Sequence, residues 1–197
     1  MKKVIEEIKS KQITLVKTDV KYKTKFVIKL VNELGFIRRE KTFLYSFRDS
    51  SRYYMYRVLS FLSGIEVQEL ARYFEPCTWF GKGKYSIDRN KFIDAIETIQ
   101  KSPIVMFSDD MKSSNEEYLE YLFTDRDNDY FIIVGINELY EKCNLSPQEM
   151  ISKIRSLASN KHIILIMNQQ QQDLCSKYVD EVIEIDQIEG DKVSYDW

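Results

Sequence analysis

Three observations predict an α/β domain with a mainly parallel sheet. Only 6 glycines and 3 prolines interrupt the 197 residues, so most of the chain should lie in regular elements. Short, β-branched apolar runs recur without polar alternation, which is typical of strands buried on both faces of a parallel sheet. Segments with helical periodicity separate these runs, and such an alternation indicates an α/β fold. The strand-like runs are ITLV (13–16), TFLYSF (42–47), PIVMF (103–107), YFIIVG (130–135) and HIILIM (162–167).

Three of the expected helices carry signals at their ends. The first follows the Ser50-Ser51 pair as its N-cap and closes at Gly64 as its C-cap. The second, within residues 86–103, places Phe92, Ile96 and Ile99 on one face and stops before a proline. The third begins with Ser146 as N-cap, Pro147 as the first helical residue and Glu149 in position to complete a capping box.

Residues 18–35 are ambiguous by periodicity alone. Apolar and lysine residues alternate from Val20 to Leu30, as they would in a strand. A helical stripe with a C-cap at Gly35 fits equally well. We predict the helix, because the run at 42–47 needs a crossover to lie parallel to the run at 13–16. The last stretch, residues 180–197, reads as two short strands joined by a turn at Gly190-Asp191.

Composition sets the domain organisation and excludes several kinds of site. The length fits one domain over residues 1–197, with residues 1–11 as a helical N-terminal extension. No apolar run approaches the roughly 18 residues that a membrane span needs. The three cysteines lie far apart, which indicates reduced thiols and a cytoplasmic protein. With one histidine and no C-x-x-C pair, a structural zinc site or a histidine-based triad is not expected.

Four segments, read in order, match the layout of one known family. RVLSFLSGIEVQEL (57–70) follows a strand that ends in YSF, and residues 87–110 run from a helix into a strand that ends in Asp109-Asp110. YFIIVGINEL (130–139) looks like a Walker B strand, and residues 148–170 look like a helix and a strand that presents a glutamine. The chain thus resembles the C-terminal RecA-like P-loop domain of DnaB-type replicative hexameric helicases over most of residues 10–187. The resemblance implies a three-layer sandwich with a mainly parallel central sheet and the ITLV strand near its centre.

The resemblance places a phosphate loop, or Walker A motif, at residues 17–24, but the motif is degenerate. The pattern G-x-x-x-x-G-K-[ST] uses glycines so that backbone N–H groups can wrap phosphates. Lys23 and Thr24 fill the Lys and Ser/Thr positions, whereas Lys17 and Tyr22 occupy the glycine positions. The glutamine at the strand end is Gln169. Lys23, Thr24 and Gln169 are therefore the candidate nucleotide-binding residues.

The matched catalytic positions do not suit ATP hydrolysis. The family's catalytic glutamate falls on Arg48, and a guanidinium cannot act as a general base at neutral pH. The Walker B aspartate falls on Gly135, with Asn137 and Glu138 just beyond. The resemblance therefore implies a pseudo-ATPase with no catalytic residue, no metal site and no resident cofactor. Binding of ATP with Mg²⁺ stays open as an alternative.

The first third of the chain offers a candidate partner or nucleic-acid surface. Residues 1–60 hold 15 Lys and Arg against 6 Asp and Glu, and a basic surface attracts acidic or phosphate-rich partners. In the resembled family, the loops matching residues 137–146 and 168–177 hold single-stranded DNA, but here they lack net positive charge. A protein partner is favoured over DNA, because Tyr and Arg are enriched in protein interfaces. The surface residues, interleaved with aromatic ones, are Arg38, Arg39, Lys41, Arg48, Arg52 and Arg57.

These observations predict a catalytically inactive helicase-like domain that acts as a binding module. Its expected setting is DNA replication or mobile-element maintenance, with a helicase subunit, another replication protein or a second copy as partner. One alternative is a divergent ATPase that uses Asp49 or Glu138 in displaced roles. Another is a self-assembling structural protein without a ligand.

Overall fold

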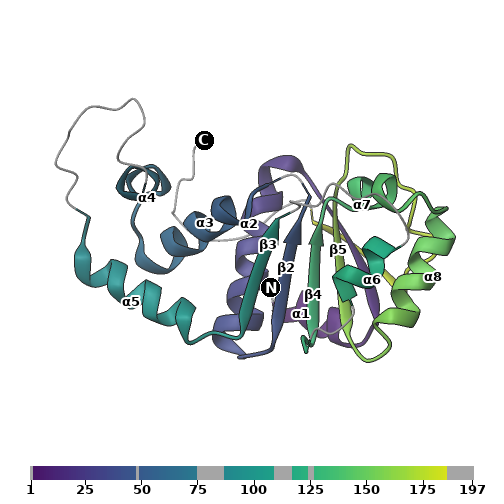
Figure 1. Cartoon of the computed structure of the whole chain (residues 1–197), viewed down its shortest axis with the longest axis horizontal. Helices are drawn as coiled ribbons and strands as arrows, with labels where there is room; N and C mark the ends of the chain where they lie inside the picture. The colour runs from purple at the N-terminus through teal and green to yellow at the C-terminus, as the bar shows by residue number, and fades with distance from the viewer. Residues whose placement is uncertain (1, 48, 75–86, 109–116, 124–126, 186–197) are drawn as a thin grey trace.

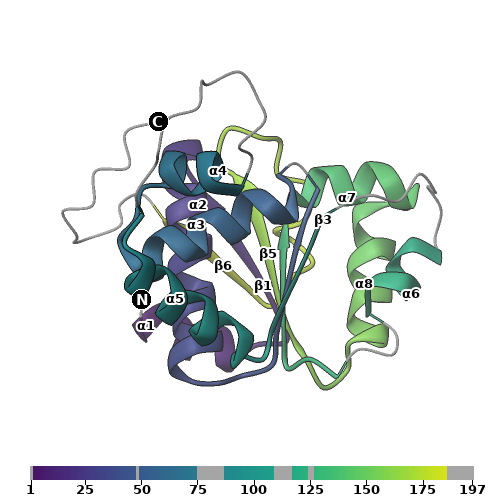
Figure 2. The same cartoon turned by 60° about the vertical axis from the view of Figure 1, so that its left-hand side comes forward.

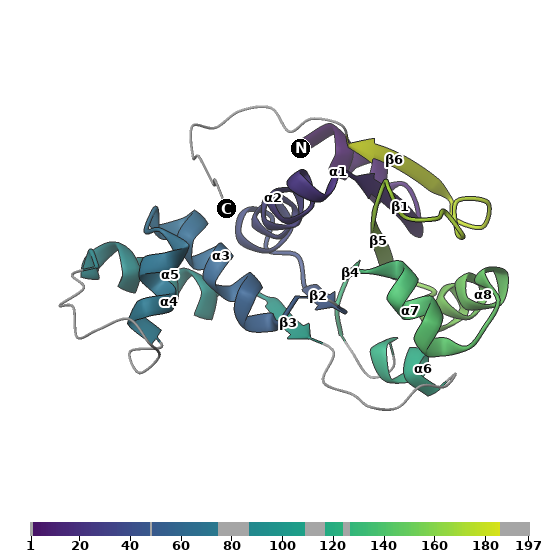
Figure 3. The same ribbon diagram turned by 90° about the horizontal axis from the view of Figure 1, so that it is seen from above.

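The computed structural model describes residues 2–47, 49–74, 87–108, 117–123 and 127–185. In them, six strands form one sheet in the order β3-β2-β4-β5-β1-β6, and every neighbouring pair is parallel (Figure 1, Figure 3). The predicted α/β fold with a parallel central sheet is confirmed. The strands are β1 (Ile13–Thr18), β2 (Thr42–Ser46), β3 (Ile104–Ser108), β4 (Tyr130–Val134), β5 (His162–Asn168) and β6 (Glu181–Ile185).

Helices cover both faces of the sheet, which gives three layers (Figure 3). α1, α2 and α3 pack on one face, and α6, α7 and α8 pack on the other. α4 and α5 pack against α3 and extend past β3 (Figure 2, Figure 3). The helices are α1 (Lys2–Lys9), α2 (Val20–Val31), the π-helix η1 (Asn32–Ile37), α3 (Ser51–Ser63), α4 (Val67–Phe74), α5 (Arg89–Gln100), α6 (Glu117–Phe123), α7 (Ile136–Cys143) and α8 (Pro147–Leu157). None of the described helices is long and apolar enough to cross a membrane.

Two apolar cores explain why the central strands lack polar alternation. In β4, Phe131 and Ile133 face the core under α6–α8, whereas Ile132 and Val134 face the core under α1–α3. All four side chains are at most 1% exposed. Successive residues of a strand point to opposite faces, so a strand covered on both sides must be apolar throughout.

The helix-end signals form as predicted. Ser50 accepts a hydrogen bond from the backbone N–H of Tyr53 at the start of α3, and Gly64 ends that helix at φ 69°. Ser146 and Glu149 form a complete capping box at the start of α8. Residues 20–31 are helical, which confirms the helix over the strand for this segment. α1 forms within the predicted N-terminal extension and buries two isoleucines in the core beneath α2.

Gly35 does not end its helix, as the apolar stripe had suggested. α2 continues into η1, and Gly35 is buried inside that π-helix. A Cβ atom built on Gly35 would lie 2.2 Å from both Cγ1 and Cδ1 of Ile104 on β3. The glycine is needed for close packing against the sheet, and the chain turns later, at Arg39, where φ is 60°.

Two strand predictions also need correction. β3 lies at an edge and is not buried on both faces, because Val105 and Phe107 are 41% and 39% exposed. β1 lies between β5 and β6, one strand in from the other edge of the described sheet, and not at its centre. The first strand predicted within residues 180–197 is β6, and the turn and second strand lie outside the described residues.

Candidate functional site

A single residue, Asp19, joins β1 to α2 at the place predicted for the phosphate loop. β1 ends at Thr18, and the helix already begins at Val20. The Asp19 carboxylate accepts a hydrogen bond from the backbone N–H of Lys21 at 3.0 Å and so caps the helix. The backbone carbonyl of Asp19 accepts the N–H groups of Tyr22 and Lys23, both at 3.0 Å. These N–H groups therefore serve the helix, and no loop in this segment offers them to a phosphate.

Lys23 and Thr24 are engaged with residues that follow β2. Lys23 Nζ lies 3.5 Å from Asp49 Oδ2, and the lysine side chain is only 17% exposed. Thr24 Oγ1 is 3.3 Å from the hydroxyl of Tyr53 on α3. Asp49 Oδ2 also accepts a hydrogen bond from the Tyr54 hydroxyl at 3.2 Å. The two residues retained from the phosphate-loop pattern thus tie α2 to the start of α3.

The Tyr54 hydroxyl is held protonated in this arrangement. Burial raises the pKa of Tyr54, and the neighbouring Asp49 carboxylate raises it further. Tyr54 is therefore a permanent hydrogen-bond donor to Asp49 at physiological pH. A carboxylate that already holds one lysine and one hydroxyl is poorly placed to take a new role as a general base.

Lys17, which matches the first glycine of the pattern, forms a second internal ion pair. Its Nζ lies 2.6 Å from Asp173 Oδ2 and 3.8 Å from Glu184 Oε1. Partial burial alone would raise the pKa of Asp173, but hydrogen bonds from Lys17 and Ser176 outweigh it and lower the pKa to about 2. The Asp173 carboxylate is therefore ionised at neutral pH, and the pair links β1 to the segment after β5.

Gln169 lies beside the same junction. Its backbone N–H donates to the Thr18 carbonyl at 3.0 Å, directly after the last residue of β5. Lys23, Thr24 and Gln169 thus all lie near the carboxyl ends of the strands. The contacts of Lys23 with Asp49 and of Thr24 with Tyr53 are internal to the chain.

An acidic side chain at the Walker B position would strain the backbone. Gly135 caps α7 with φ 97°, a conformation that L side chains rarely adopt. A Cβ atom there would lie 2.9 Å from Glu138 Oε2 and 3.2 Å from Phe47 Cβ. Asn137 donates from Nδ2 to the carbonyl of Gln172 at 3.4 Å. Residues 137–143, which were matched to a DNA-binding loop, form most of α7.

The residues of the predicted basic surface come from two segments of the chain. Arg38, Arg39 and Lys41 precede β2, whereas Arg52 and Arg57 lie on α3, after β2. The strand β2 therefore separates the two groups in the sequence. Arg48 and the Asp109-Asp110 pair lie outside the described residues.

Acidic and carbonyl groups of the chain engage the first group of basic residues. Arg38 contacts Glu6 at 3.0 Å and Glu33 at 3.2 Å, and hydrogen bonds to both carboxylates raise the pKa of this guanidinium. Arg39 donates from Nη1 to a backbone carbonyl at the end of α5 at 3.1 Å. Lys41 forms an ion pair with Asp127. On α3, the Arg57 guanidinium lies 4.6 Å from the centre of the Tyr53 ring.

Sequence reasoning did not find the contacts that Asp19, Asp49 and Asp173 make at this site, and it named Asp49 only as a possible displaced catalytic residue. Asp19 could have been found, because an aspartate directly before a helical stripe is a common N-cap. The roles of Asp49 and Asp173 could not, because they depend on contacts between segments that are distant in the chain.

Comparisons with known proteins bear on the fold. No protein-family model matches the chain, and no curated protein matches it. Among solved structures, it is similar to one described as an ATPase domain, with a TM-score of 0.59 and 18% identity over 83% of this chain and 61% of that one. It is also similar to a DnaB-like replicative helicase studied with its primase interactions, with a TM-score of 0.53 and 14% identity over 83% of this chain and 42% of that one.

A third similar structure is the flagellar accessory protein FlaH from Methanocaldococcus jannaschii, with a TM-score of 0.50 and 12% identity over 85% of this chain and 64% of that one. This chain spans less than two-thirds of the length of each of the three. Similarities at these identities define the fold. The chain has the RecA-like P-loop fold of DnaB-type helicase ATPase domains, as the sequence resemblance implied.

Proposed function

We propose that this chain is a catalytically inactive RecA-like domain that acts as a binding module in DNA replication or mobile-element maintenance. The observation that carries the proposal is the junction of β1 and α2. Asp19 caps the helix there, and Asp49 neutralises Lys23. The chain thus supplies its own carboxylates at the place where nucleotide phosphates would sit.

The charge of these carboxylates opposes phosphate binding. A helix N-terminus attracts anions because it carries free N–H groups and the positive end of the helix dipole. In α2, the Asp19 carboxylate already occupies this position as the N-cap. A phosphate brought within about 4 Å of a carboxylate meets a repulsion of about 4 kcal/mol at an effective dielectric constant of about 20. To bind phosphate, Lys23 would also have to leave Asp49. We therefore assign no resident nucleotide and no Mg²⁺.

Hydrolysis would lack two further parts of the usual machinery. The base position falls on an arginine, Arg48, and the Mg²⁺-holding position falls on Gly135, where a φ of 97° would strain any side chain. Loss of a general base alone typically costs about 10²–10⁴-fold in rate. The remaining role for a folded domain of this kind is to bind another macromolecule.

A protein partner from replication fits the fold better than DNA alone. One solved structure of this fold is described together with its primase interactions, so the fold can serve protein contacts. In the part of the chain that the structure describes, Arg38 and Lys41 already hold acidic partners. We propose a helicase or another replication protein as the partner.

We also propose a cytoplasmic location, which is in keeping with the buried thiols of Cys143 and Cys175. Burial raises the pKa of both thiols to about 11.

A binding assay on the purified chain tests this function. The replicative helicase of the same cell is immobilised, and the chain is titrated over it without nucleotide. We expect saturable binding that Lys23→Ala leaves unchanged, because the lysine serves an internal ion pair. A fluorescently labelled single-stranded oligonucleotide is titrated in parallel. Absence of binding to both the helicase and the oligonucleotide would contradict the proposed role.

A further inference from the structure

β3 is an edge strand of the sheet that the described residues form. Among the described strands, it pairs with β2 alone, in the register Thr42 to Ile104 through Ser46 to Ser108. In a parallel pair, alternate residues direct their backbone N–H and C=O groups away from the neighbouring strand. The edge of β3 therefore offers a row of hydrogen-bonding groups to another extended chain (Figure 1).

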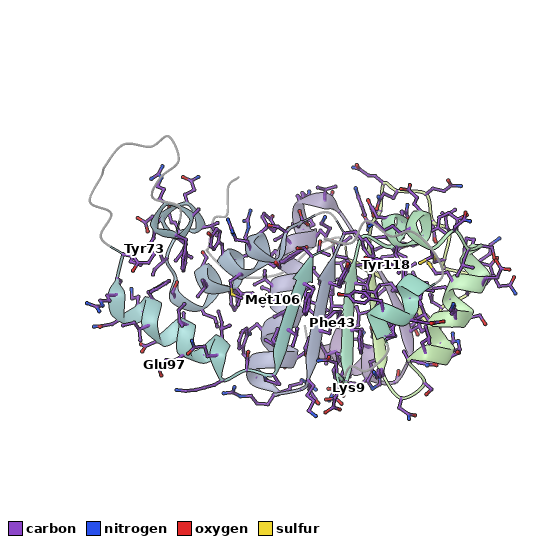
Figure 4. All side chains as sticks on the ribbon, in the orientation of Figure 1. Lys9, Phe43, Tyr73, Glu97, Met106 and Tyr118 are labelled. Atoms are coloured by element: carbon purple, nitrogen blue, oxygen red, sulfur yellow. The ribbon has the colours of Figure 1, made fainter. Side chains whose placement is uncertain are left out.

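The side chains of β3 are not of the kinds that prevent an edge strand from pairing with another strand. Val105 and Phe107 lie on the α6 side and are 41% and 39% exposed. Met106 packs on the other side, towards α3 (Figure 4). The strand IVMFS contains no charged residue and no proline, which are the residues that natural edge strands use to prevent pairing. An edge strand without such residues is a candidate interface with another chain.

We propose that β3 pairs with β3 of a second copy of this chain, so that the two sheets join edge to edge. Two copies related by a two-fold axis place the same strand against itself, and the strands must then run antiparallel. Pairing all five residues of each strand centres the axis on Met106. Val105 of one copy then lies opposite Phe107 of the other, and this contact occurs twice. An aromatic and a β-branched residue opposite each other stabilise a pair of antiparallel strands.

The chemistry of the strand favours a second copy over a different peptide. The exposed side chains of β3, Val105 and Phe107, are apolar, and each lies opposite the other type in β3 of the second copy. The strand itself carries no charge that would select an acidic or basic peptide. No like charges meet within the five paired residues, so nothing in the strand opposes the symmetric pairing.

The expected dimer is weak. Stable interfaces bury about 1,200–2,000 Å², and one pair of five-residue strands supplies only part of that area. Association should therefore depend on concentration. The pairing extends the proposed function by naming a second copy as one partner, but the argument for it depends on β3 alone. If β3 does not pair with a second copy, the proposed function as a catalytically inactive binding module is unaffected.

Light scattering on the full chain over a range of protein concentrations tests this pairing. We expect the mean mass to rise from 23.5 kDa towards twice that value. The double variant Val105→Lys with Phe107→Lys sets lysines of the two copies against each other, so it should remain at the monomer mass. The double variant Val105→Lys with Phe107→Glu sets a lysine against a glutamate in the antiparallel register, so it should associate again.

The matched control is Ile93→Lys, at a 42% exposed position on α5, which should associate like the wild type. Circular dichroism establishes that each variant is folded. If the Phe107 variants do not fold, Val105→Lys alone must weaken the association at least tenfold. A wild type that keeps the monomer mass at every concentration overturns the pairing. A folded double-lysine variant that associates like the wild type also overturns the pairing. Failure of the lysine–glutamate variant to associate overturns the proposed register.

Discussion

Gly135→Asp, which restores the Walker B acid, is expected to lower the free energy of unfolding by about 3 kcal/mol and to create no Mg²⁺ site. A side chain at φ 97° costs about 1–3 kcal/mol in backbone strain. Its Cβ would lie 3.2 Å from Phe47 Cβ, and crowding of this kind costs about 1–3 kcal/mol, whereas Glu138 Oε2, at 2.9 Å, ends a flexible side chain that can shift at little cost. The N–H of Gly135 donates to the Ile166 carbonyl at 3.1 Å, so the backbone is not free to move aside.

Urea unfolding measures the loss, with Gly64→Asp as the matched control. Gly64 also has a positive φ, 69°, but a Cβ there would meet no atom within 4 Å. The control should therefore lose only about 1–2 kcal/mol, the cost of a left-handed backbone. Equal losses for the two variants would contradict the crowding at Gly135. A Gly135→Asp protein that Mg²⁺ stabilises would contradict the account of the site.

Gly35→Ala is the second large effect that we expect, with a loss of up to about 2 kcal/mol. The new Cβ would lie 2.2 Å from both Cγ1 and Cδ1 of Ile104, so either the Ile104 side chain must change its rotamer or β3 and the π-helix η1 must separate. Overpacking of this kind typically costs about 1–3 kcal/mol. The better helix propensity of alanine, worth about 1 kcal/mol, offsets part of the loss.

A double-mutant cycle with Ile104→Ala identifies the contact that causes the loss. Truncation of Ile104 removes both atoms that the new Cβ would meet, so the double variant should lose less than the two single variants together. The expected coupling energy lies between about 0.5 and 3 kcal/mol. Strictly additive losses would show that Gly35 is needed for another reason, such as its backbone conformation.

The local sequence predicted the central strands and the helix ends because their causes are local. A strand buried on both faces, such as β4, must be apolar at each position. The cap at Ser146 depends only on residues up to Glu149. β3 has a similar apolar pattern but lies at the edge, and a strand's neighbours in the sheet cannot be inferred from its own five residues.

The candidate site was less predictable because it depends on contacts between distant segments. A match to the phosphate-loop pattern assumed a loop before Lys23 and Thr24, where the chain has one residue, Asp19, between β1 and α2. The pairing of Lys17 with Asp173 joins opposite ends of the chain. Gly35 could serve as a C-cap or as a packing residue, and only the position of Ile104 distinguishes the two.

Calorimetric titration of ATP with Mg²⁺ into the wild type and into Lys23→Ala tests the central claim, that the chain's own carboxylates replace the nucleotide. Thermal unfolding first establishes that both proteins are folded. We expect no saturable heat from either protein, because Lys23 is paired with Asp49 and Asp19 already caps α2. Saturable binding to the wild type that Lys23→Ala removes would contradict the account, since Lys23 would then exchange Asp49 for a phosphate.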